Sequence, residues 1–328
     1  MIKRLLTYIS PSLFKKISLL KFNWKYHSWR NTKNKKQVII CFDAYGLHGG
    51  LVDRLKGIIS VYYLSKIYGY DFKINFTHPY HLQDYLIPAA YDWYTDIKDL
   101  SWNVFNTKFI DARNTDTELA LIQKTFKKGK RKIFIYTNID FLPQIIKKAA
   151  ESNVIWSNLF SELFSFSPNL IERVDSYSTE YHISSSAVGI HTRFTTLLGD
   201  FEDVTERWLS SSEQVILMQK VWCQIKELYI KENWNQLILF SDSIRFLEFA
   251  KFKNAENNAI DLIILPGNPS HSDRSSVITD GYFKSFLDFM MMSRLSAMYS
   301  LVTDKMYPSA FPAYAAKLAD SPFRLIQF

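Results

Sequence analysis

Residues 48–60 have the sequence HGGLVDRLKGIIS and follow a short apolar run at 38–42. A glycine pair, Gly49 and Gly50, lies between the apolar run and the residues from Leu51 onward. The apolar side chains that follow recur at helical spacing, at Leu51, Leu55, Ile58 and Tyr62. An apolar run, a glycine turn and this period predict a strand, a tight turn and then an amphipathic helix with a basic first turn.

A second strand-like run, 187–190, brings His191 and Arg193 to its carboxyl end. In open α/β sheets, ligands bind outside the carboxyl ends of the strands. Two such sites in the two halves of one chain predict an α/β protein with two Rossmann-like domains facing a central cleft.

Strand-like and helical patterns alternate along most of the chain, which indicates parallel, doubly wound sheets. Strands are expected at 38–42, 72–76, 132–136, 187–191, 237–241, 261–265 and 299–303. Helices are expected from 51 to a cap at Gly69, near 141–150 and 157–165, from Pro168 onward, and near 211–231, 244–252, 280–296 and 309–319. Serine and threonine cluster at 176–186, so the predicted parts are a basic arm at 1–36, an N-terminal domain at 37–180 and a C-terminal domain at 181–328.

The composition supports a folded chain with two domains. Of its 328 residues, 47% are hydrophobic and 16% are aromatic, which is enough for sizeable cores. Cys41 and Cys223 both lie in apolar patterns, so buried thiols are expected rather than a disulfide or a zinc site. This cysteine usage predicts a cytoplasmic protein.

The net charge of +8 is concentrated in the first 36 residues, which contain no acidic side chain. Their basic residues are Lys3, Arg4, Lys15, Lys16, Lys21, Lys25, Arg30, Lys33, Lys35 and Lys36. Apolar and aromatic residues are interleaved with them, but no run reaches the roughly 18 residues of a spanning helix. Such an arm suits the anionic inner face of the cytoplasmic membrane, and the alternative is an arm packed on its own domain with solvated lysines. Nucleic acid is not expected as a partner, because the charge beyond the arm is near neutral and no nucleic-acid-binding motif is present.

Four short motifs occur in order between residues 38 and 319. They are the glycine loop at 49–58, His191-Thr192-Arg193, the strand end Phe240-Ser241-Asp242-Ser243, and the segment 286–293 followed by Tyr307-Pro308-Ser309-Ala310-Phe311. Together they resemble the fucosyltransferase superfamily of GT-B glycosyltransferases, which includes bacterial polysaccharide and nodulation, plant cell-wall, α1,6- and protein O-fucosyltransferases. The resemblance implies a GT-B-like fold, with an acceptor-side N-terminal domain and a C-terminal domain that binds the nucleotide sugar. Phe194 follows Arg193 where the commonest pattern has a second arginine or Gly-Asp, which leaves the donor and the linkage open.

The resemblance implies an inverting, metal-independent transfer of fucose from GDP-fucose to a glycan acceptor. Arg193 is the candidate to hold the departing diphosphate, because a guanidinium is always charged and binds phosphate oxygens in a bidentate way. The backbone amides of Ser309, Ala310 and Phe311, at the start of the last predicted helix, are expected to hold the same anion. No cofactor or metal is then required, and the acidic run at 200–203 lies in a polar loop rather than at the end of an apolar strand.

Two side chains beside the first glycine turn, Asp43 and His48, are candidates for the general base. A histidine that titrates near neutrality is a good base, and a carboxylate serves if it is desolvated. The alternative for His48 is a loop histidine bonded to the backbone.

Further residues are expected at the donor. The complete set is Gly49, Gly50, Arg54, His191, Arg193, Asp242, Asp288, Ser309, Ala310 and Phe311. His191 is expected to orient Arg193 or to touch phosphate. Asp242 and Asp288 are candidates for ribose or guanine contacts, with helix capping as the alternative. His271, with Asp273 and Arg274, is a candidate for a loop on the donor side.

The basic arm and the usage rich in lysine, asparagine and isoleucine suggest a bacterial surface polysaccharide, such as an O-antigen or a capsule. The expected acceptor is an oligosaccharide or a lipid-linked glycan at the membrane. Two alternatives remain open: a GT-B glycosyltransferase that uses another nucleotide sugar, and a non-catalytic protein that binds a glycan or a nucleotide.

Overall fold

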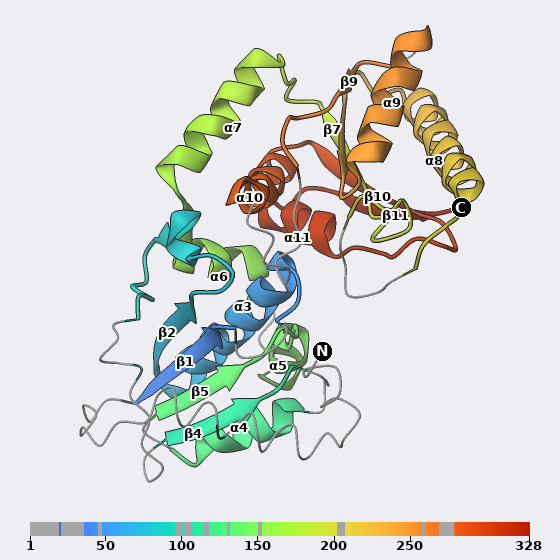
Figure 1. Ribbon diagram of the computed structural model, residues 1–328. Coiled ribbons are helices and arrows are strands. Elements are labelled where there is room, and N and C mark those ends of the chain that lie inside the picture. The colour runs from blue at the N-terminus through green and yellow to red at the C-terminus, as the bar shows by residue number, and fades with distance from the viewer. Residues whose placement is uncertain are drawn as a thin grey trace.

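The computed structural model describes Leu20, 36–44, 48–95, Leu100, 107–113, 118–129, 132–149, 153–201, 207–257, 260–268 and 279–328. Apart from Leu20 and Lys36, the predicted basic arm lies outside the described residues, as does the loop with His271, Asp273 and Arg274. The described part forms two lobes, each built around a parallel sheet (Figure 1).

The N-terminal lobe contains a four-stranded parallel sheet with the order β2-β1-β5-β4. Its strands are β1 (Gln37–Phe42), β2 (Asp71–Phe76), β4 (Thr107–Asp111) and β5 (Lys132–Tyr136). Every residue of β1 and β5 is buried, as expected for apolar runs at the centre of a covered sheet. These two strands pair in parallel, so the segments that follow Phe42 and Tyr136 leave the sheet side by side.

Helix α3 (Leu51–Tyr68) follows β1 and is more deeply buried than the predicted amphipathic helix. From Leu51 to Ser65 all residues are buried except Asp53 and Lys56. The reason is that four helices contact α3 in addition to its own sheet: α4 (Leu119–Lys127), α5 (Leu142–Ala149), α6 (Trp156–Leu163) and α11 (Phe311–Leu318). Gly69 ends the helix as predicted, with a φ of 66° that favours glycine.

The C-terminal lobe contains a five-stranded parallel sheet with the order β11-β10-β7-β8-β9. Its strands are β7 (Val188–Thr192), β8 (Leu237–Ser241), β9 (Leu262–Ile263), β10 (Ala297–Val302) and β11 (Phe323–Gln327). Helices α8 (Ser211–Lys231) and α9 (Ile244–Asn257) connect β7 to β8 and β8 to β9, while α10 (Thr279–Ser293) and α11 precede and follow β10. The strand order reverses between β7 and β10, which makes this pair the switch point where ligands bind in open α/β sheets.

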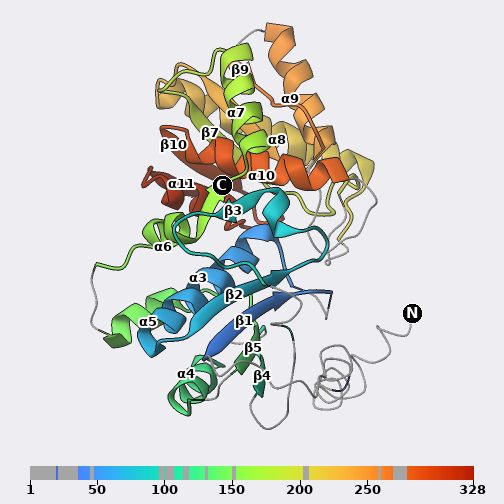
Figure 2. The same cartoon turned by 90° about the vertical axis from the view of Figure 1, so that its left-hand side faces the viewer.

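A continuous hydrophobic cluster joins the two lobes. Figure 2 shows α10 and α11 on the side of the C-terminal lobe that faces the N-terminal lobe. There α10 contacts α7 (Pro168–Glu180), and α11 contacts α3 and α6. Tyr85, between the short turn η1 (Leu82–Asp84) and β3 (Leu86–Pro88), stacks on Phe286 of α10 with ring centroids 4.4 Å apart. Such aromatic pairs add to the free energy of apolar burial, so the lobes are held together by part of their cores.

Several elements are not predicted from the sequence. They are β4, α4 (Leu119–Lys127), β11 and the antiparallel pair of β3 with β6 (Phe164–Phe166). Strand β11 is at the sheet edge with three of its five residues exposed, so no apolar run marks it. Both cysteines are free, but only Cys41 is fully buried, so the prediction of buried thiols is correct for one of them. Within the described ranges, no helix has both the length and the apolar character that crossing a membrane requires.

Gly57 allows α3 to lie directly against the segment that follows β5. A Cβ atom at Gly57 would be 2.2 Å from the carbonyl oxygen of Thr137. We expect Gly57→Ala to lower the free energy of unfolding by about 3 kcal/mol, because helix and strand must separate to admit the methyl group. Chemical denaturation measures this change.

Gly50→Ala is the matched control, since a Cβ there meets nothing closer than 3.9 Å and the φ of −67° suits alanine. Equal stability of Gly57→Ala and Gly50→Ala would contradict the close approach.

Candidate active site

The N-terminal part of the site lies at the carboxyl ends of β1 and β5. Asp43 follows β1 directly, and its Oδ1 accepts a hydrogen bond of 3.0 Å from the hydroxyl of Tyr136, the last residue of β5. His48 is fully buried, with its ring 5.4 Å from that of Phe42 and stacked 5.9 Å from that of Tyr136. Both candidate bases therefore surround one tyrosine that the sequence analysis did not select.

The glycine turn is held in place by Arg54. This side chain is wholly buried, and its guanidinium donates to the carbonyl oxygens of Gly49, at 3.0 Å, and His78, at 2.6 Å. Gly49 has a φ of 78°, and a Cβ at this position would be 3.0 Å from the amide nitrogen of Asn138. The structure thus shows Arg54 positioning the turn, while its predicted contact with a donor stays a prediction.

The C-terminal part of the site follows β7 at the switch point. Arg193 comes directly after the strand, and its guanidinium carbon is 5.7 Å from the ring centroid of Tyr307. Tyr307 is 61% exposed, in the segment that connects β10 to α11. A cation over an aromatic face is attracted to it, so Tyr307 helps to orient Arg193.

His191 is nearly buried, one residue before the end of β7. Burial, and then the neighbouring Arg193 cation, lower the pKa of His191 to about 3. The imidazole is therefore neutral at physiological pH and adds no charge to the site. Its ring lies 6.0 Å from that of Phe311, the first residue of α11.

Asp242 holds the turn that carries Arg193. It follows β8, and its two carboxylate oxygens accept hydrogen bonds from the backbone N–H groups of Phe194 and Thr195, each at 2.8 Å. Burial raises the pKa of Asp242 to about 6, although Arg193 and the two N–H donors oppose this rise. Asp242 therefore acts on Arg193 through the backbone.

The start of α11 adjoins His191, and the amide of Phe311 there already has a partner. The N–H of Phe311 donates to Ser309 Oγ at 3.2 Å, and Pro312, in the first turn, has no N–H. The Ser309 hydroxyl accepts this bond and keeps its own hydrogen to donate. Ala310 is the N-cap residue and makes no side-chain bond there.

Tyr314 of α11 connects the two parts of the site. Its hydroxyl donates to Asp140 in the N-terminal lobe, and the ammonium of Lys56 is 5.0 Å from its ring centroid. Burial and the carboxylates of Asp140 and Asp53 raise the pKa of Tyr314 well above its usual range. Tyr314 thus fixes the start of α3, after Gly50, beside α11. The first residue of α11 in turn adjoins His191.

Asp288 lies on the adjacent helix α10, where it is buried and ion-paired with Lys284 one turn earlier. Burial raises the pKa of Asp288, and the lysine opposes this effect. The i,i+4 spacing of the pair is visible in the sequence. A Cβ at Gly267, after β9, would be 3.0 Å from the Lys284 side chain, so the pair lies beside that loop.

The acidic run at 200–203, expected to lie in a polar loop, is described at Asp200, which has a structural role. Asp200 accepts hydrogen bonds from the Ser243 hydroxyl and the Arg245 N–H, and so caps the start of α9. Among the described residues, no three His, Cys, Asp or Glu side chains are grouped as metal ligands would be.

The raised pKa of Asp242 gives a test of its environment. A pKa of about 6, against an ordinary 3.8, means that the folded state binds this proton more tightly than the unfolded chain. The free energy of unfolding of the parent, relative to Asp242→Asn, should therefore fall by about 3 kcal/mol as the pH rises from below 3.8 to above 6. Denaturation across this pH range measures the difference.

Asp304→Asn, at an exposed position, serves as the control. The raised pKa would be excluded if the free energy of unfolding of the parent, relative to Asp242→Asn, stayed constant or rose with pH.

Solved structures share this fold, although no protein-family profile and no curated protein sequence matches the chain significantly. FUT1 from Arabidopsis thaliana, an arginine-to-lysine variant in complex with GDP, has a TM-score of 0.63 at 13% identity, over 96% of this chain and 74% of FUT1. The α1,6-fucosyltransferase NodZ soaked with GDP-fucose has a TM-score of 0.54 at 14% identity, over 90% of this chain and 95% of NodZ. NodZ from Bradyrhizobium, in a third structure, has a TM-score of 0.55 at 13% identity over the same shares. The chain therefore has the GT-B fold of these fucosyltransferases.

Proposed function

We propose that this protein transfers fucose from GDP-fucose to a glycan acceptor, with inversion at the transferred carbon and without a metal ion. The observation that carries the proposal is the placement of Arg193. Asp242 and Tyr307 hold this arginine at the switch point, beside the start of α11. A fixed cation there suits a departing diphosphate, and the structural relatives include complexes with GDP and GDP-fucose.

In this proposal Arg193 and Ser309 bind the leaving group together. The arginine fork neutralises the charge that grows on the diphosphate as the sugar bond breaks. The Ser309 hydroxyl donates to a phosphate oxygen. It thereby replaces the backbone N–H of Phe311 as a donor to the diphosphate, because that N–H is already bonded to Ser309 Oγ. Neutral His191 donates or accepts a hydrogen bond at the same place without adding charge.

The nucleoside is proposed to lie toward α10. Asp288 is a candidate to accept hydrogen bonds from ribose or guanine, and Lys284 keeps its carboxylate in place. Gly49, Gly50 and Arg54 are proposed to shape the opposite wall, where Arg54 fixes the glycine turn.

The general base is proposed to come from the N-terminal lobe. His48 is the first candidate and Asp43 the second, and both contact Tyr136. A base on one lobe and a leaving-group site on the other suit a single displacement, in which the acceptor oxygen attacks opposite the departing diphosphate. Such a displacement inverts the configuration.

The acceptor is proposed to be an oligosaccharide or a lipid-linked glycan of a bacterial surface polysaccharide. The basic arm at 1–36 is proposed to place the enzyme on the inner face of the cytoplasmic membrane. A GT-B glycosyltransferase with another nucleotide sugar, or a non-catalytic binding protein, is the alternative that the following test separates.

Calorimetric titration with GDP, UDP and CMP tests the nucleotide. We expect GDP to bind most tightly, and the purified protein to hydrolyse GDP-fucose slowly in the presence of excess EDTA. Turnover should also depend on Arg193: both Arg193→Ala and Arg193→Lys are expected to lose about 10²–10³-fold, while GDP affinity falls less, because lysine keeps the charge but lacks the fork.

Arg324, exposed on the edge strand β11, provides the control substitutions to alanine and lysine. Stronger binding of UDP or CMP would support another donor, and GDP binding without hydrolysis or transfer would support a binding protein. A near-normal rate in Arg193→Lys, or activity lost on chelation and restored by Mg²⁺, would refute the metal-free role of Arg193.

Replacing the candidate bases separates their roles. His48→Ala should lower turnover by about 10²-fold or more with little change in GDP affinity, because proton removal from the acceptor slows while donor binding does not.

Asp43→Asn is the paired variant, in which Tyr136 keeps an acceptor for its hydroxyl. Full activity of His48→Ala together with a large loss in Asp43→Asn would assign the base to Asp43. Full activity of both would exclude this part of the site as the source of the base.

A further inference from the structure

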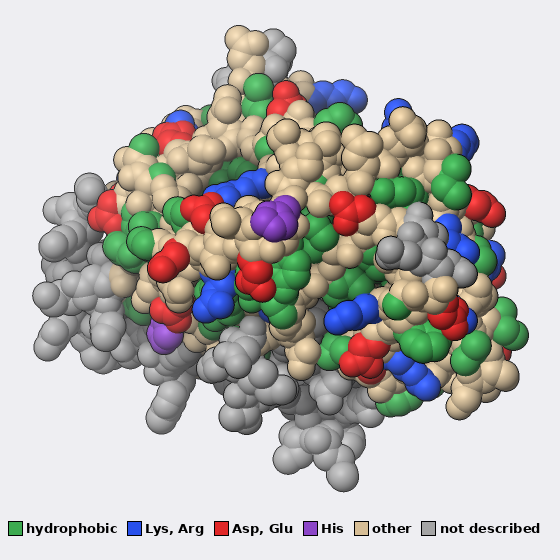
Figure 3. All heavy atoms as spheres, turned by 90° about the horizontal axis from the view of Figure 1, so that it is seen from above, with side chains coloured by type: hydrophobic (Ala, Val, Ile, Leu, Met, Phe, Trp, Pro, Cys, Tyr) green, Lys and Arg blue, Asp and Glu red, His purple; other side chains and the backbone are tan. Residues whose placement is uncertain are grey.

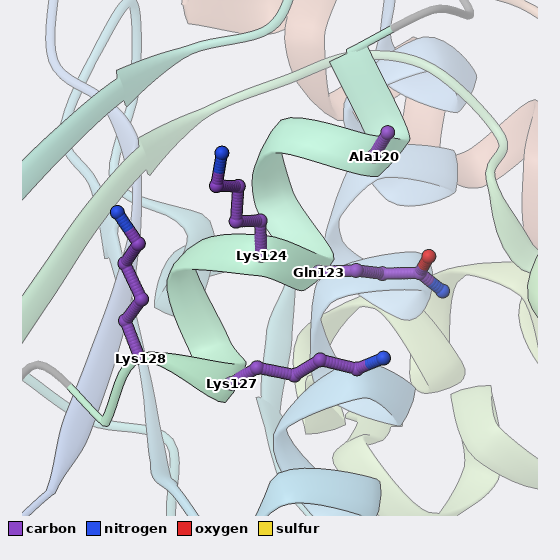
Figure 4. A pocket seen from close by; sticks show the side chains of 5 residues that line it. All are labelled: Ala120, Gln123, Lys124, Lys127 and Lys128. Atoms are coloured by element: carbon purple, nitrogen blue, oxygen red, sulfur yellow. The ribbon is translucent and has the colours of Figure 1, made fainter.

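Helix α4 presents an exposed basic face on the N-terminal lobe. Lys124, Lys127 and Lys128 line an open hollow of about 410 Å³ together with Ala120 and Gln123 (Figure 4). All three lysines are exposed, and no carboxylate lines the hollow. In Figure 4 Lys124 and Lys128 point to one side of the helix and Lys127 to another, so their ammonium groups do not converge on one point.

These lysines differ from the paired lysines elsewhere on the described surface. Lys66, Lys73 and Lys253 each form an ion pair with a glutamate or an aspartate. Within the described part of the chain, no such pair is formed by Lys124 and Lys127 of α4 or by Lys128, the residue that follows the helix. On the top of the C-terminal lobe, acidic and basic side chains are interspersed (Figure 3). The face of α4 is therefore a local concentration of positive charge.

The basic arm joins the fold next to this face. Lys36, directly before β1, has its ammonium 5.8 Å from the ring centroid of Tyr70. The hydroxyl of Tyr70 donates to the carbonyl of Phe126, which lies in α4 between Lys124 and Lys127. Lys36 and the carboxyl end of α4 thus lie at the same part of the lobe.

This part of the lobe is opposite the candidate active site. Lys36 precedes the first residue of β1 and Asp43 follows the last, so the six residues of the strand separate them. At about 3.3 Å per residue, the strand spans about 20 Å. A surface that docks through α4 therefore leaves the site open.

We propose that the outer face of α4, with Lys36, docks on an anionic lipid bilayer. Spread lysines fit a broad field of headgroups, whereas a compact phosphate ligand needs convergent donors. Leu121 is 44% exposed and lies one turn before Lys124, where it supplies an apolar side chain to the interface. The proposal is independent of the catalytic proposal, because no α4 residue belongs to the candidate active site.

The test compares three forms of the full chain in vesicle sedimentation. They are the parent, the triple variant Lys124→Gln, Lys127→Gln and Lys128→Gln, and a control triple variant Lys226→Gln, Lys231→Gln and Lys251→Gln on α8 and α9. The vesicles contain equal parts of phosphatidylglycerol and phosphatidylcholine, or phosphatidylcholine alone.

The α4 variant should bind the anionic vesicles about 100-fold more weakly than the parent, because each lysine near such a surface contributes about 1 kcal/mol. The control should lose far less, since it has the same net charge but keeps α4. The far-UV circular dichroism spectrum and the thermal melting temperature should be the same in all three forms, which shows that the fold is intact without relying on the catalytic proposal.

Three outcomes would overturn the docking surface. They are equal losses in the α4 and control variants, equal binding to vesicles with and without phosphatidylglycerol, and no binding of the parent to either. Displacement of the parent from vesicles by a DNA duplex, with DNA binding lost in the α4 variant, would assign the surface to nucleic acid instead.

Discussion

Helix α11 belongs to the C-terminal sheet by its connections and to the N-terminal lobe by many of its contacts. Its first residue, Phe311, adjoins His191, and one turn later Tyr314 binds Asp140 and meets Lys56 and Trp156. One helix therefore fixes the start of α3 relative to the end of β7. This packing joins the glycine turn and the arginine turn through the core that the two lobes share.

Burial controls the electrostatics of the site more than direct ion pairing does. It makes His191 a neutral ring and raises the pKa of Asp242, while Arg193 opposes the second effect and adds to the first. Backbone N–H groups, rather than a cation alone, satisfy the carboxylate of Asp242. The arginine turn is thus held by hydrogen bonds within the chain itself.

The fold class and most strand and helix positions could be predicted from the sequence, because continuous apolar runs mark central parallel strands. The prediction of two Rossmann-like lobes with a GT-B fold is confirmed. Contacts between segments distant in sequence were not predictable: Tyr136 on Asp43, Tyr307 on Arg193 and Tyr314 on Asp140. The roles of Arg54 and Asp242 in holding turns were missed for the same reason. A charged residue beside a glycine or at a strand end looks the same in the sequence whether its side chain binds a ligand or the backbone.

The late position of α11 in the chain also affects how the protein folds during synthesis. Helix α3 is complete at Tyr68, but one of the helices that cover it begins only at Phe311. The same holds for Tyr85, whose stacking partner Phe286 is made some two hundred residues later. The N-terminal lobe therefore keeps apolar surface uncovered on the ribosome until α10 and α11 have emerged, and it is in this interval that a chaperone has a surface to bind.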